Sequence, residues 1–492
     1  MTHLAHNARL AVLWTTGFTL FRDLLQFGLM LVLVRLLPAE AYGQFGLTTT
    51  VLGFLTLYSF RSFLGHTLQV RAPEETNFQI HFTAGTVIQA GVFVVANLVA
   101  LALRWFPAYA PVAPLLHAMS FVFLLDLPSE LRVKMLERNL DWRRLRGLHA
   151  LALTLAAGLS IVLAIFGWEV YALLLPLLIV PGPFIYDLFV RARWRPTWEW
   201  SWSAYRSAWR FGGARMFAAS FVSAATLLES TWLTAVVGFA AFGVFGRALG
   251  LSHLACHRVA TLVSTSVYPV LTKIAPRTDA YRKASALILR SVAWTVVPVA
   301  VLIGFLAADV VSLLYGDRWG AVVPLLPWAV SGGVVVAVVQ PAYTLLLAHE
   351  RQDRCLIADI WRLVGTVAIL LACLPFGLPA YLAGLALVHV VSLGLMIYWL
   401  ERDGAVSLGG ISAALVPPVV AALIGAGAIG VCLGLLPGEA GSLWRSLAGG
   451  CTFGAAYVVS LRLLYREALL ELVGYLPKRR RLSRLLLLPG AA

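Results

Sequence analysis

Apolar stretches of about twenty residues follow one another along almost the whole chain, separated by short charged or Pro/Gly-rich breaks. That length is what an α-helix needs to cross the hydrocarbon core of a bilayer. The 492 residues are 60% hydrophobic and 12% charged, about half the charged fraction of a water-soluble domain. Alternating ten-residue strands, the mark of an outer-membrane barrel, do not occur. The chain is therefore predicted to be an all-α polytopic membrane protein.

Fourteen membrane spans are predicted, joined by loops too short to contain a soluble domain. Their expected bounds are 11–35, 43–66, 79–103, 113–133, 147–167, 170–190, 211–236, 244–271, 285–314, 321–348, 356–375, 378–399, 411–435 and 443–465. Basic residues gather in alternate loops, above all within 132–146, 191–210, 273–283 and 351–354. Because cytoplasmic loops are enriched in Lys and Arg, this asymmetry predicts that both chain termini lie in the cytoplasm.

Several classes of protein are disfavoured by the sequence. The net charge of +15 follows from the loop asymmetry and does not indicate binding of nucleic acid. No cleavable signal peptide is expected, because the first nine residues are polar and no short apolar region with a cleavage site follows. The five cysteines form no C-x-x-C pair, so neither a disulfide framework nor a zinc site is predicted. Enzyme signatures and nucleotide-binding loops are missing, which predicts a protein that is not an enzyme, has no cofactor and does not use ATP directly.

A six-residue phrase occurs twice, as AYGQFG at Ala41–Gly46 and as AFGVFG at Ala241–Gly246, 200 residues apart. Each copy begins the turn into a predicted span, the second and the eighth, on the outer face of the membrane. Two six-helix lobes of like orientation would produce this spacing, and the glycines would admit close approach of a neighbouring helix. The predicted organisation is an N-terminal lobe over 1–200, a C-terminal lobe over 201–402, two further spans over 403–465 and a basic amphipathic tail over 466–492.

The first predicted span carries a polar stripe, Thr15, Thr19, Arg22 and Gln26, with Asp23 at its edge. At about 100° per residue these positions fall on one helix face. An Arg or Asp near a helix centre costs on the order of 3 kcal/mol in lipid, so this face is expected to meet protein or a water-filled cavity. Since adjacent residues on a helix do not face each other, Arg22 and Asp23 could alternatively satisfy partners on a neighbouring helix.

Polar residues also occur in the seventh and eighth predicted spans, which would be equivalent to the first and second in a duplicated chain. The seventh holds Arg215 and Glu229, and the eighth holds Arg247, His253 and His257. Polar groups thus concentrate where two lobes would meet, and a central hydrophilic cavity is expected. The histidines lie one turn apart, as two metal ligands would, but no third ligand accompanies them and no metal is predicted. Buried, hydrogen-bonded histidines and cavity or proton-relay histidines both stay open.

The C-terminal tail combines an amphipathic stretch, LLYREALLELVGYL, with the basic run PKRRRLSR at Pro477–Arg484. A basic side chain near an anionic membrane surface gains about 1 kcal/mol. The tail is therefore predicted to lie as a helix on the inner leaflet, with docking to a protein partner as the alternative. The residues expected to contact anionic lipid are Lys478, Arg479, Arg480, Arg481 and Arg484.

Four phrases carry a family resemblance: LVRLLPAEAYGQFGL (Leu33–Leu47), PSELRVKMLERNLDWRRLR (Pro128–Arg146), SVYPVLTKI (Ser266–Ile274) and LLYGDRWGAVVPLL (Leu313–Leu326). They resemble the polysaccharide flippases of the multidrug/oligosaccharidyl-lipid/polysaccharide exporter superfamily. The resemblance implies two six-helix lobes in a V shape around a central cavity, followed here by two C-terminal helices. It also implies that the chain translocates undecaprenyl-diphosphate-linked oligosaccharide units across the bacterial inner membrane by alternating access, for cell-surface polysaccharide synthesis.

The same resemblance implies roles for the polar residues. Arg22, Arg215 and Arg247 would bind the diphosphate, because a guanidinium offers bidentate geometry to phosphate oxygens. Asp23 and Glu229 would act as counter-charges or coupling sites, although many family members carry Asp where this chain has Glu229. The other residues expected to line the cavity are Thr19, Gln26, His253 and His257. Polysaccharide polymerase or export machinery is the expected protein partner.

Two other functions stay open. The first is ion-coupled antiport of small molecules or drugs, as in other members of the superfamily, whose usual cationic cargo would need fewer cavity arginines. The second is an enzyme such as a polysaccharide polymerase or ligase. An enzyme of that kind is expected to carry a sizeable catalytic loop on the outer face, and the predicted outer loops are short.

Overall fold

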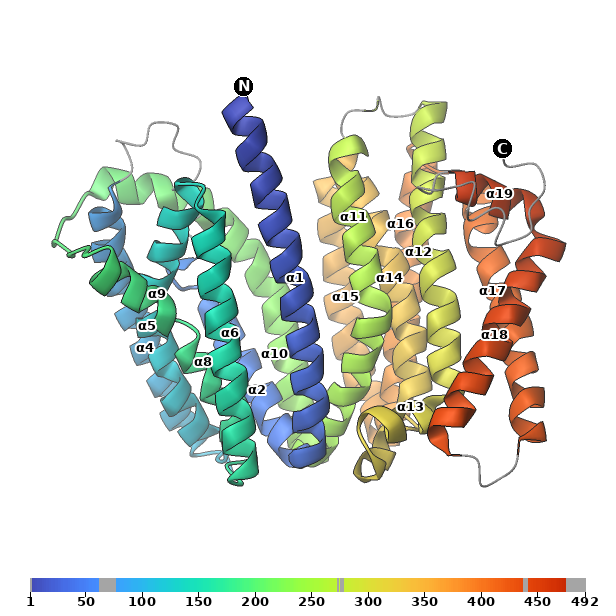
Figure 1. Cartoon of the computed structure of the whole chain (residues 1–492), viewed down its shortest axis with the longest axis horizontal. Coiled ribbons are helices and arrows are strands. Elements are labelled where there is room, and N and C mark those ends of the chain that lie inside the picture. Colours follow the sequence, from blue (N-terminus) through green and yellow to red (C-terminus); the bar gives the residue numbers. More distant parts are fainter. Residues whose placement is uncertain (1, 62–76, 272–273, 275–277, 437–440, 475–492) are drawn as a thin grey trace. The chain divides into compact units, whose positions relative to one another are not determined.

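The computed structural model describes residues 2–61, 77–271, 274, 278–436 and 441–474, with only the backbone described at 2–9, 266–270, 471–474 and parts of 203–222. Within these residues all regular secondary structure is helical and no strand occurs (Figure 1), which confirms the all-α prediction. The chain divides into two compact units, Met1–Gly243 and Val244–Ala492. The predicted lobe boundaries near residues 200 and 402 were drawn from the repeated phrase, and they stay a prediction.

The first unit contains the helices from α1 to the greater part of α10. They are α1 (Thr2–Leu36), α2 (Ala39–Thr56), α4 (Phe78–Leu103), α5 (Val112–Arg138), α6 (Trp142–Ile165), α7 (Tyr171–Leu174), α8 (Pro176–Ile179), α9 (Gly182–Tyr186), the π-helical turn η3 (Asp187–Arg191) and α10 (Trp202–Ser252) as far as Gly243. α1 packs along α6, and α4 packs along α5. The sixth predicted span is broken into α7, α8, α9 and η3, because its prolines lack the N–H that a continuous helix needs.

The second unit contains the remaining helices. They are η4 (His253–His257), α11 (Arg258–Leu271), α12 (Asp279–Phe305), α13 (Ala307–Leu314), η5 (Asp317–Val322), α14 (Leu326–Ala348), α15 (Gln352–Cys373), η6 (Leu374–Phe376), α16 (Leu378–Arg402), α17 (Leu408–Leu435), α18 (Ser442–Leu464) and α19 (Arg466–Gly474). α17 and α18 pack against each other, and α17 packs on α12. Trp294 and Phe453 share their apolar core, and the Tyr457 hydroxyl donates to the Trp294 carbonyl at 3.2 Å. The two C-terminal spans are thus part of the second unit.

Twelve described helical stretches are long and apolar enough to cross a membrane, so the chain is a multi-pass membrane protein. One of them, Ala219–Thr265, covers most of both the seventh and the eighth predicted spans. Its helix is interrupted at Gly238, where φ is 81° and ψ is 169°. α2, the second predicted span, has 18 described residues and is not among the twelve stretches. The predicted number of fourteen is therefore approximate.

The repeated phrase packs on its own copy inside the first unit. A Cβ atom added to Gly43 would overlap the backbone carbonyl of Phe239, and one added to Gly243 would overlap that of Ala39. Positions 39 and 239 are 200 residues apart, as are 43 and 243, so the contact is reciprocal. The close helix approach predicted from these glycines is confirmed, since any side chain there would push the two backbones apart.

Candidate functional site

The charged pair of the α1 polar stripe is held together within the helix. Arg22 Nε and Nη2 lie 3.1 Å and 3.0 Å from Asp23 Oδ1. This differs from the expectation that sequence neighbours do not face each other, because the long stem of Arg22 lets its guanidinium reach sideways to the adjacent carboxylate. The Arg22 and Asp23 side chains are 39% and 29% exposed within the unit. The pair is therefore only partly covered by protein.

The other residues of the stripe are partly covered or exposed within the first unit. The Thr19 hydroxyl donates to the Thr15 carbonyl at 2.8 Å, so it is satisfied inside α1. Thr15 and Thr19 are half-buried, and Gln26 is exposed. A polar helix face that its own unit leaves partly uncovered would be costly against lipid, and it is typical of a helix that borders water or a polar ligand.

Glu229 is half-buried in the part of α10 that belongs to the first unit. The neighbouring Ser230 and Thr234 are buried, and the Thr234 hydroxyl donates to the Ser230 carbonyl at 2.8 Å. The side chain of Arg215 lies outside the described residues, so its predicted phosphate contact stays a prediction. The same holds for the basic residues of the tail, Lys478, Arg479, Arg480, Arg481 and Arg484.

The second unit contains Arg247, His253 and His257. His253–His257 forms the π-helical turn η4, a rare geometry that is frequent at functional sites. The two imidazole centroids lie 5.6 Å apart, and His257 Nδ1 is buried with no hydrogen-bond partner in the described part of the chain. Arg247 is half-buried, and its carbonyl accepts a hydrogen bond from the Tyr315 hydroxyl at 3.3 Å. In the described ranges, no group of three or more His, Cys, Asp or Glu side chains is placed to hold a metal.

Among the predicted site residues, the structure brings Arg22 together with Asp23 and His253 together with His257. The first pair belongs to the first unit, as does Glu229, whereas the histidines belong to the second unit.

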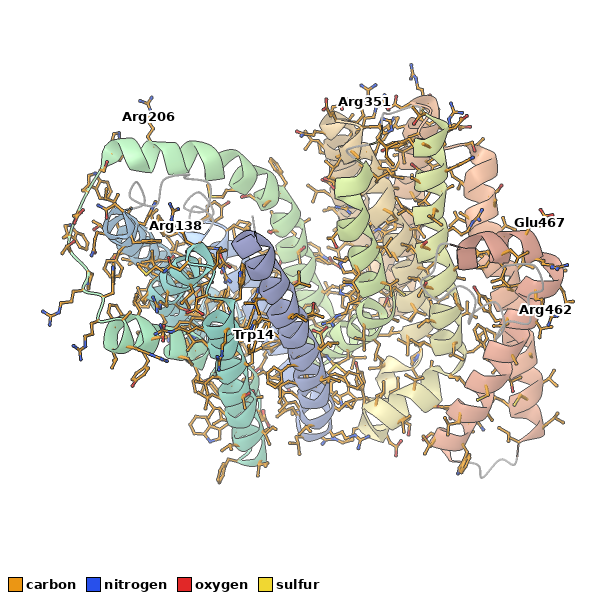
Figure 2. The ribbon with its side chains drawn as sticks, turned by 45° about the horizontal axis from the view of Figure 1, so that its top comes forward. Trp14, Arg138, Arg206, Arg351, Arg462 and Glu467 are labelled. Atoms are coloured by element: carbon orange, nitrogen blue, oxygen red, sulfur yellow. The ribbon has the colours of Figure 1, made fainter. Side chains whose placement is uncertain are left out.

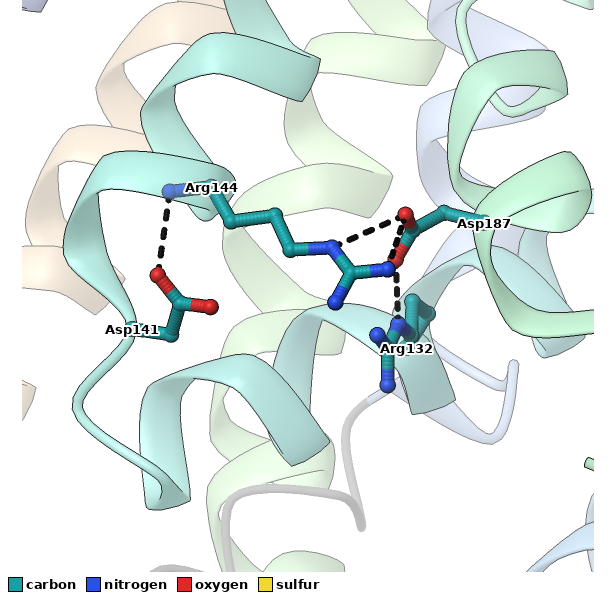
Figure 3. Close-up of polar contacts among 4 residues, drawn as sticks. All are labelled: Arg132, Asp141, Arg144 and Asp187. Carbon is teal, nitrogen blue, oxygen red and sulfur yellow. Dashed lines mark hydrogen bonds and ion pairs between the residues drawn. The ribbon is translucent and has the colours of Figure 1, made fainter. Parts of the chain in front are cut away.

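A buried ion cluster in the first unit joins three elements (Figure 3). Asp187 in η3 is 2% exposed and accepts a 2.6 Å hydrogen bond from Arg132 Nε at the end of α5. It also accepts hydrogen bonds from Arg144 Nε and Nη2 in α6, at 2.9 Å and 2.6 Å. Asp141 caps α6 by accepting a hydrogen bond from the Arg144 backbone N–H at 3.2 Å. This cap fixes the first turn of α6, from which the Arg144 side chain extends. The Asp187 carboxylate is thus shared by two guanidiniums.

The second unit contains a similar cluster, again with one Asp paired to two arginines. Asp403, which follows α16, is 6% exposed and lies 3.1 Å from Arg351 Nε and 2.6 Å from Arg354 Nη1, both at the start of α15. In the sequence these arginines indicate only the topology. Neither cluster can be recognised there, because the partners are 43 to 55 residues apart and leave no periodic pattern. The available signal was a single Asp at the end of each helix, opposite an Arg-rich loop.

A second polar feature lies among α2, α5 and the helices around Pro181 in the first unit. It is a cavity of about 280 Å³ lined by Thr49, Arg61 and Asp126 among others. Arg61 also forms a 2.8 Å ion pair with Glu130. The guanidinium of Arg61 is thus engaged by a carboxylate of α5.

The chain is similar to proteins of polysaccharide biosynthesis. A family model described as polysaccharide biosynthesis protein matches residues 32–324. The chain is 23% identical over 355 residues to the succinoglycan biosynthesis transport protein ExoT of Rhizobium meliloti, covering 70% of this chain and 69% of that protein. It is 22% identical over 334 residues to the lipopolysaccharide biosynthesis protein WzxC of Escherichia coli, covering 66% of each.

Solved structures of the same architecture are also known. The lipid II flippase MurJ, in an inward closed conformation, aligns with a TM-score of 0.69 at 10% identity, over 93% of this chain and 100% of that one. An inward-facing multidrug resistance transporter of the MATE family aligns with a TM-score of 0.55 at 18% identity, over 78% and 95%. These alignments show that the fold is the one shared by MurJ and the MATE transporters.

Proposed function

Because this chain belongs to the polysaccharide biosynthesis protein family, we propose that it is a flippase that moves lipid-linked oligosaccharide repeat units from the inner to the outer leaflet of the bacterial inner membrane. The observation that carries the proposal is the family match over residues 32–324. The relatives named for succinoglycan transport and lipopolysaccharide biosynthesis support a role in supplying cell-surface polysaccharide. The chain is accordingly a transporter and not an enzyme.

The diphosphate of such a cargo determines what the protein must provide. An anion that crosses a membrane needs cationic partners, and Arg22 in the polar stripe of α1 supplies one. Without cargo, Asp23 neutralises Arg22 and lowers the cost of holding a charge in the membrane region. The diphosphate then replaces Asp23 as the partner of Arg22, whose 39% exposure keeps the guanidinium accessible.

The other polar residues extend this exchange. Arg215 and Arg247 are proposed as further phosphate partners. Asp23, once the diphosphate has displaced it from Arg22, and Glu229 are proposed as sites for a coupling cation or proton. The residues proposed to contact the sugar or the ordered water around it are Thr19, Gln26, His253 and His257. The transport cycle is alternating access, with the lipid tail remaining in the bilayer. Since the sequence has no nucleotide-binding loop, an ion gradient, the membrane potential or the cargo gradient supplies the driving force.

The orientation and partners follow from the charge distribution. Both chain termini are proposed to lie in the cytoplasm, as the arginine-rich loops require. The basic tail is proposed to hold anionic lipid of the inner leaflet. Polysaccharide polymerase or export machinery is proposed to receive the flipped unit on the outer face.

Deletion of the gene in its native host, followed by analysis of lipid intermediates, tests the proposal. The expected result is accumulation of a polyprenyl-diphosphate oligosaccharide on the cytoplasmic leaflet. The wild-type chain should reverse this accumulation, and Arg22→Gln should not. Arg143→Gln is the matched control, since Arg143 is an exposed residue of α6 outside the polar stripe. Unchanged lipid intermediates in the deletion strain would refute the flippase function.

Ion-coupled antiport of small molecules is the second candidate, and the structural alignment with a multidrug resistance transporter favours it. The same deletion strain separates the two functions. Altered tolerance to cationic drugs with unchanged lipid intermediates would support the antiporter, whereas accumulation of the lipid-linked oligosaccharide with unchanged drug tolerance would support the flippase.

A further inference from the structure

A groove opens between α1 and α6 of the first unit, on a face of α1 turned away from the centre of the polar stripe. Its volume is about 540 Å³, which lies in the range of roughly 300–1,000 Å³ typical of ligand pockets. Trp14, Gly17 and Phe18 of α1 line one side, and Arg146 and Gly147 of α6 line the other. Figure 2 shows Trp14 on α1 where this helix runs along α6. The groove is therefore a feature of one unit.

Two glycines create the space in this groove. A Cβ atom added to Gly17 or to Gly147 would meet no other atom within 4 Å. Both helices thus lack side-chain bulk at the same place, while Trp14 and Phe18 form apolar walls around it. Burying a hydrocarbon chain in an apolar groove of this kind is favourable by about 25 cal/mol per Å² of apolar surface removed from water.

Arg146 is the one charged residue among those that line this groove. Its guanidinium carbon lies 5.5 Å from the ring centroid of Phe18 and 5.7 Å from that of Trp142, so two aromatic faces hold it in place. In the described part of the chain Arg146 forms no ion pair, and its Nε is buried without a hydrogen-bond partner. Arg144, two residues earlier, is instead fully engaged with Asp187. The guanidinium of Arg146 is therefore available to an anion.

The α1 wall of the groove runs from Leu10 to Phe21, which at 1.5 Å per residue is about 16 Å. Arg146 lies against Phe18, near the Phe21 end of this wall. Arg146 lies in the second turn of α6, directly after the basic loop that precedes this helix, where lipid headgroups are expected.

We propose that this groove binds the polyprenyl chain of a lipid-linked diphosphate, with Arg146 contacting the phosphate. The inference rests on the proposed function, which supplies the class of lipid. Glu137 and Arg22 both act on Arg146 electrostatically, so a carboxylate and a second guanidinium influence the same region. A diphosphate carries more negative charge than the single phosphate of a phospholipid, and it is the better match for two cations. The site would hold the cargo beside Arg22 before the headgroup is transferred.

Native mass spectrometry of the purified full chain, with undecaprenyl diphosphate as the probe, tests this site. Gly17→Leu fills the groove with a side chain that meets no protein atom at its Cβ, and Leu is a better helix former than Gly. Its matched control is Gly28→Leu, because Gly28 is in the same helix, has equally open space and does not line the groove. Arg146→Gln removes the charge, with Arg143→Gln as its control. A parallel titration uses phosphatidylglycerol.

The expected result is that Gly17→Leu and Arg146→Gln each weaken binding of undecaprenyl diphosphate by at least about tenfold, while both controls stay within about twofold of the wild type. Phosphatidylglycerol should bind more weakly and lose little on either substitution. Unchanged binding by both Gly17→Leu and Arg146→Gln would overturn the proposal. Equal binding of phosphatidylglycerol, lost in the same variants, would also overturn it and make the groove a phospholipid site.

The outcomes for the groove and for the flippase function are distinguishable. If the wild-type chain reverses the accumulation of lipid-linked oligosaccharide in the deletion strain but both groove variants bind the probe normally, the groove proposal fails alone. If the deletion strain accumulates no lipid-linked oligosaccharide, the flippase function fails, and the groove proposal loses the class of lipid on which it rests.

Discussion

The two units contain the same ion arrangement, an Asp at the end of one helix that pairs with two arginines, but they bury it to different depths. In the first unit Arg132 and Arg144 are 8% and 27% exposed and come from two different helices. In the second unit Arg351 and Arg354 are 39% and 16% exposed and come from the start of a single helix. Each carboxylate is almost completely buried.

The two clusters therefore differ in how many elements they connect and in how well water reaches their arginines. The first cluster connects α5, α6 and η3, so it fixes three elements around a charge that water barely reaches. The second connects only α15 to the end of α16, and water can hydrate Arg351 if its partner is lost. A buried charge without a partner is far more costly than an exposed one. We therefore expect the first unit to depend on its cluster more than the second unit does.

Asp187→Ala is expected to have the largest effect on stability. It leaves Arg132 and Arg144 without their shared counter-ion, so the free energy of unfolding should fall by about 3–5 kcal/mol. Chemical denaturation of the purified chain in detergent micelles measures this change. Asp279→Ala is the control, because the ion pair of Asp279 with Arg282 is exposed and should contribute less than about 1 kcal/mol. A loss for Asp187→Ala no larger than that of the control would contradict this account of the first cluster.

Asp403→Ala should cost less, about 1.5–3 kcal/mol, which is the range for hydrogen bonds to a charged group. The reason is that Arg351 is already in partial contact with solvent and can be hydrated after the carboxylate is removed. The same denaturation experiment measures the change. The comparison between the two units breaks down if Asp403→Ala proves to be more destabilising than Asp187→Ala.

Whereas the two ion clusters should differ in their contribution to stability, the two copies of the repeated glycine phrase should contribute equally. Gly43→Ala and Gly243→Ala each place a methyl group against a backbone carbonyl, and each is expected to cost about 1–3 kcal/mol. Gly53→Ala in α2 is the control, since its Cβ would meet open space and alanine favours a helix by about 0.5–1 kcal/mol. Clearly unequal costs at positions 43 and 243 would show that the reciprocal packing is not symmetric in energy.

Much of the fold could be predicted from the sequence, because bilayer thickness fixes the length of an apolar helix. The apolar runs predicted the helices, and the repeated glycines predicted a close approach that the structure shows between Gly43 and Phe239. The predicted break between the seventh and eighth spans was too wide. Those spans join at the single residue Gly238, since glycine can leave helical geometry and re-enter it without a loop.

The candidate site was less predictable, since it depends on contacts between side chains far apart in sequence. Helical periodicity placed Arg22 and Asp23 on or near one face, but it gave no sign that the two would pair with each other. Asp187 and Asp403 could not be paired with their arginines because ion pairs between helices leave no repeating spacing. The α1–α6 groove was missed for a similar reason, as it is lined by Gly17 and Gly147, which are far apart in sequence.

Translocation is tested most directly in proteoliposomes that contain the purified full chain and a fluorescent polyprenyl-diphosphate oligosaccharide in both leaflets. A membrane-impermeant quencher added outside removes only the outer-leaflet signal unless lipid crosses the bilayer. With the wild-type chain, the inner-leaflet signal is predicted to be quenched as well, as lipid crosses the bilayer. Arg22→Gln is predicted to slow quenching of this inner-leaflet signal at least about tenfold, since a hydrogen bond to a charged group contributes about 1.5–3 kcal/mol. Quenching that stops at the outer leaflet with the wild-type chain present would contradict the flippase function.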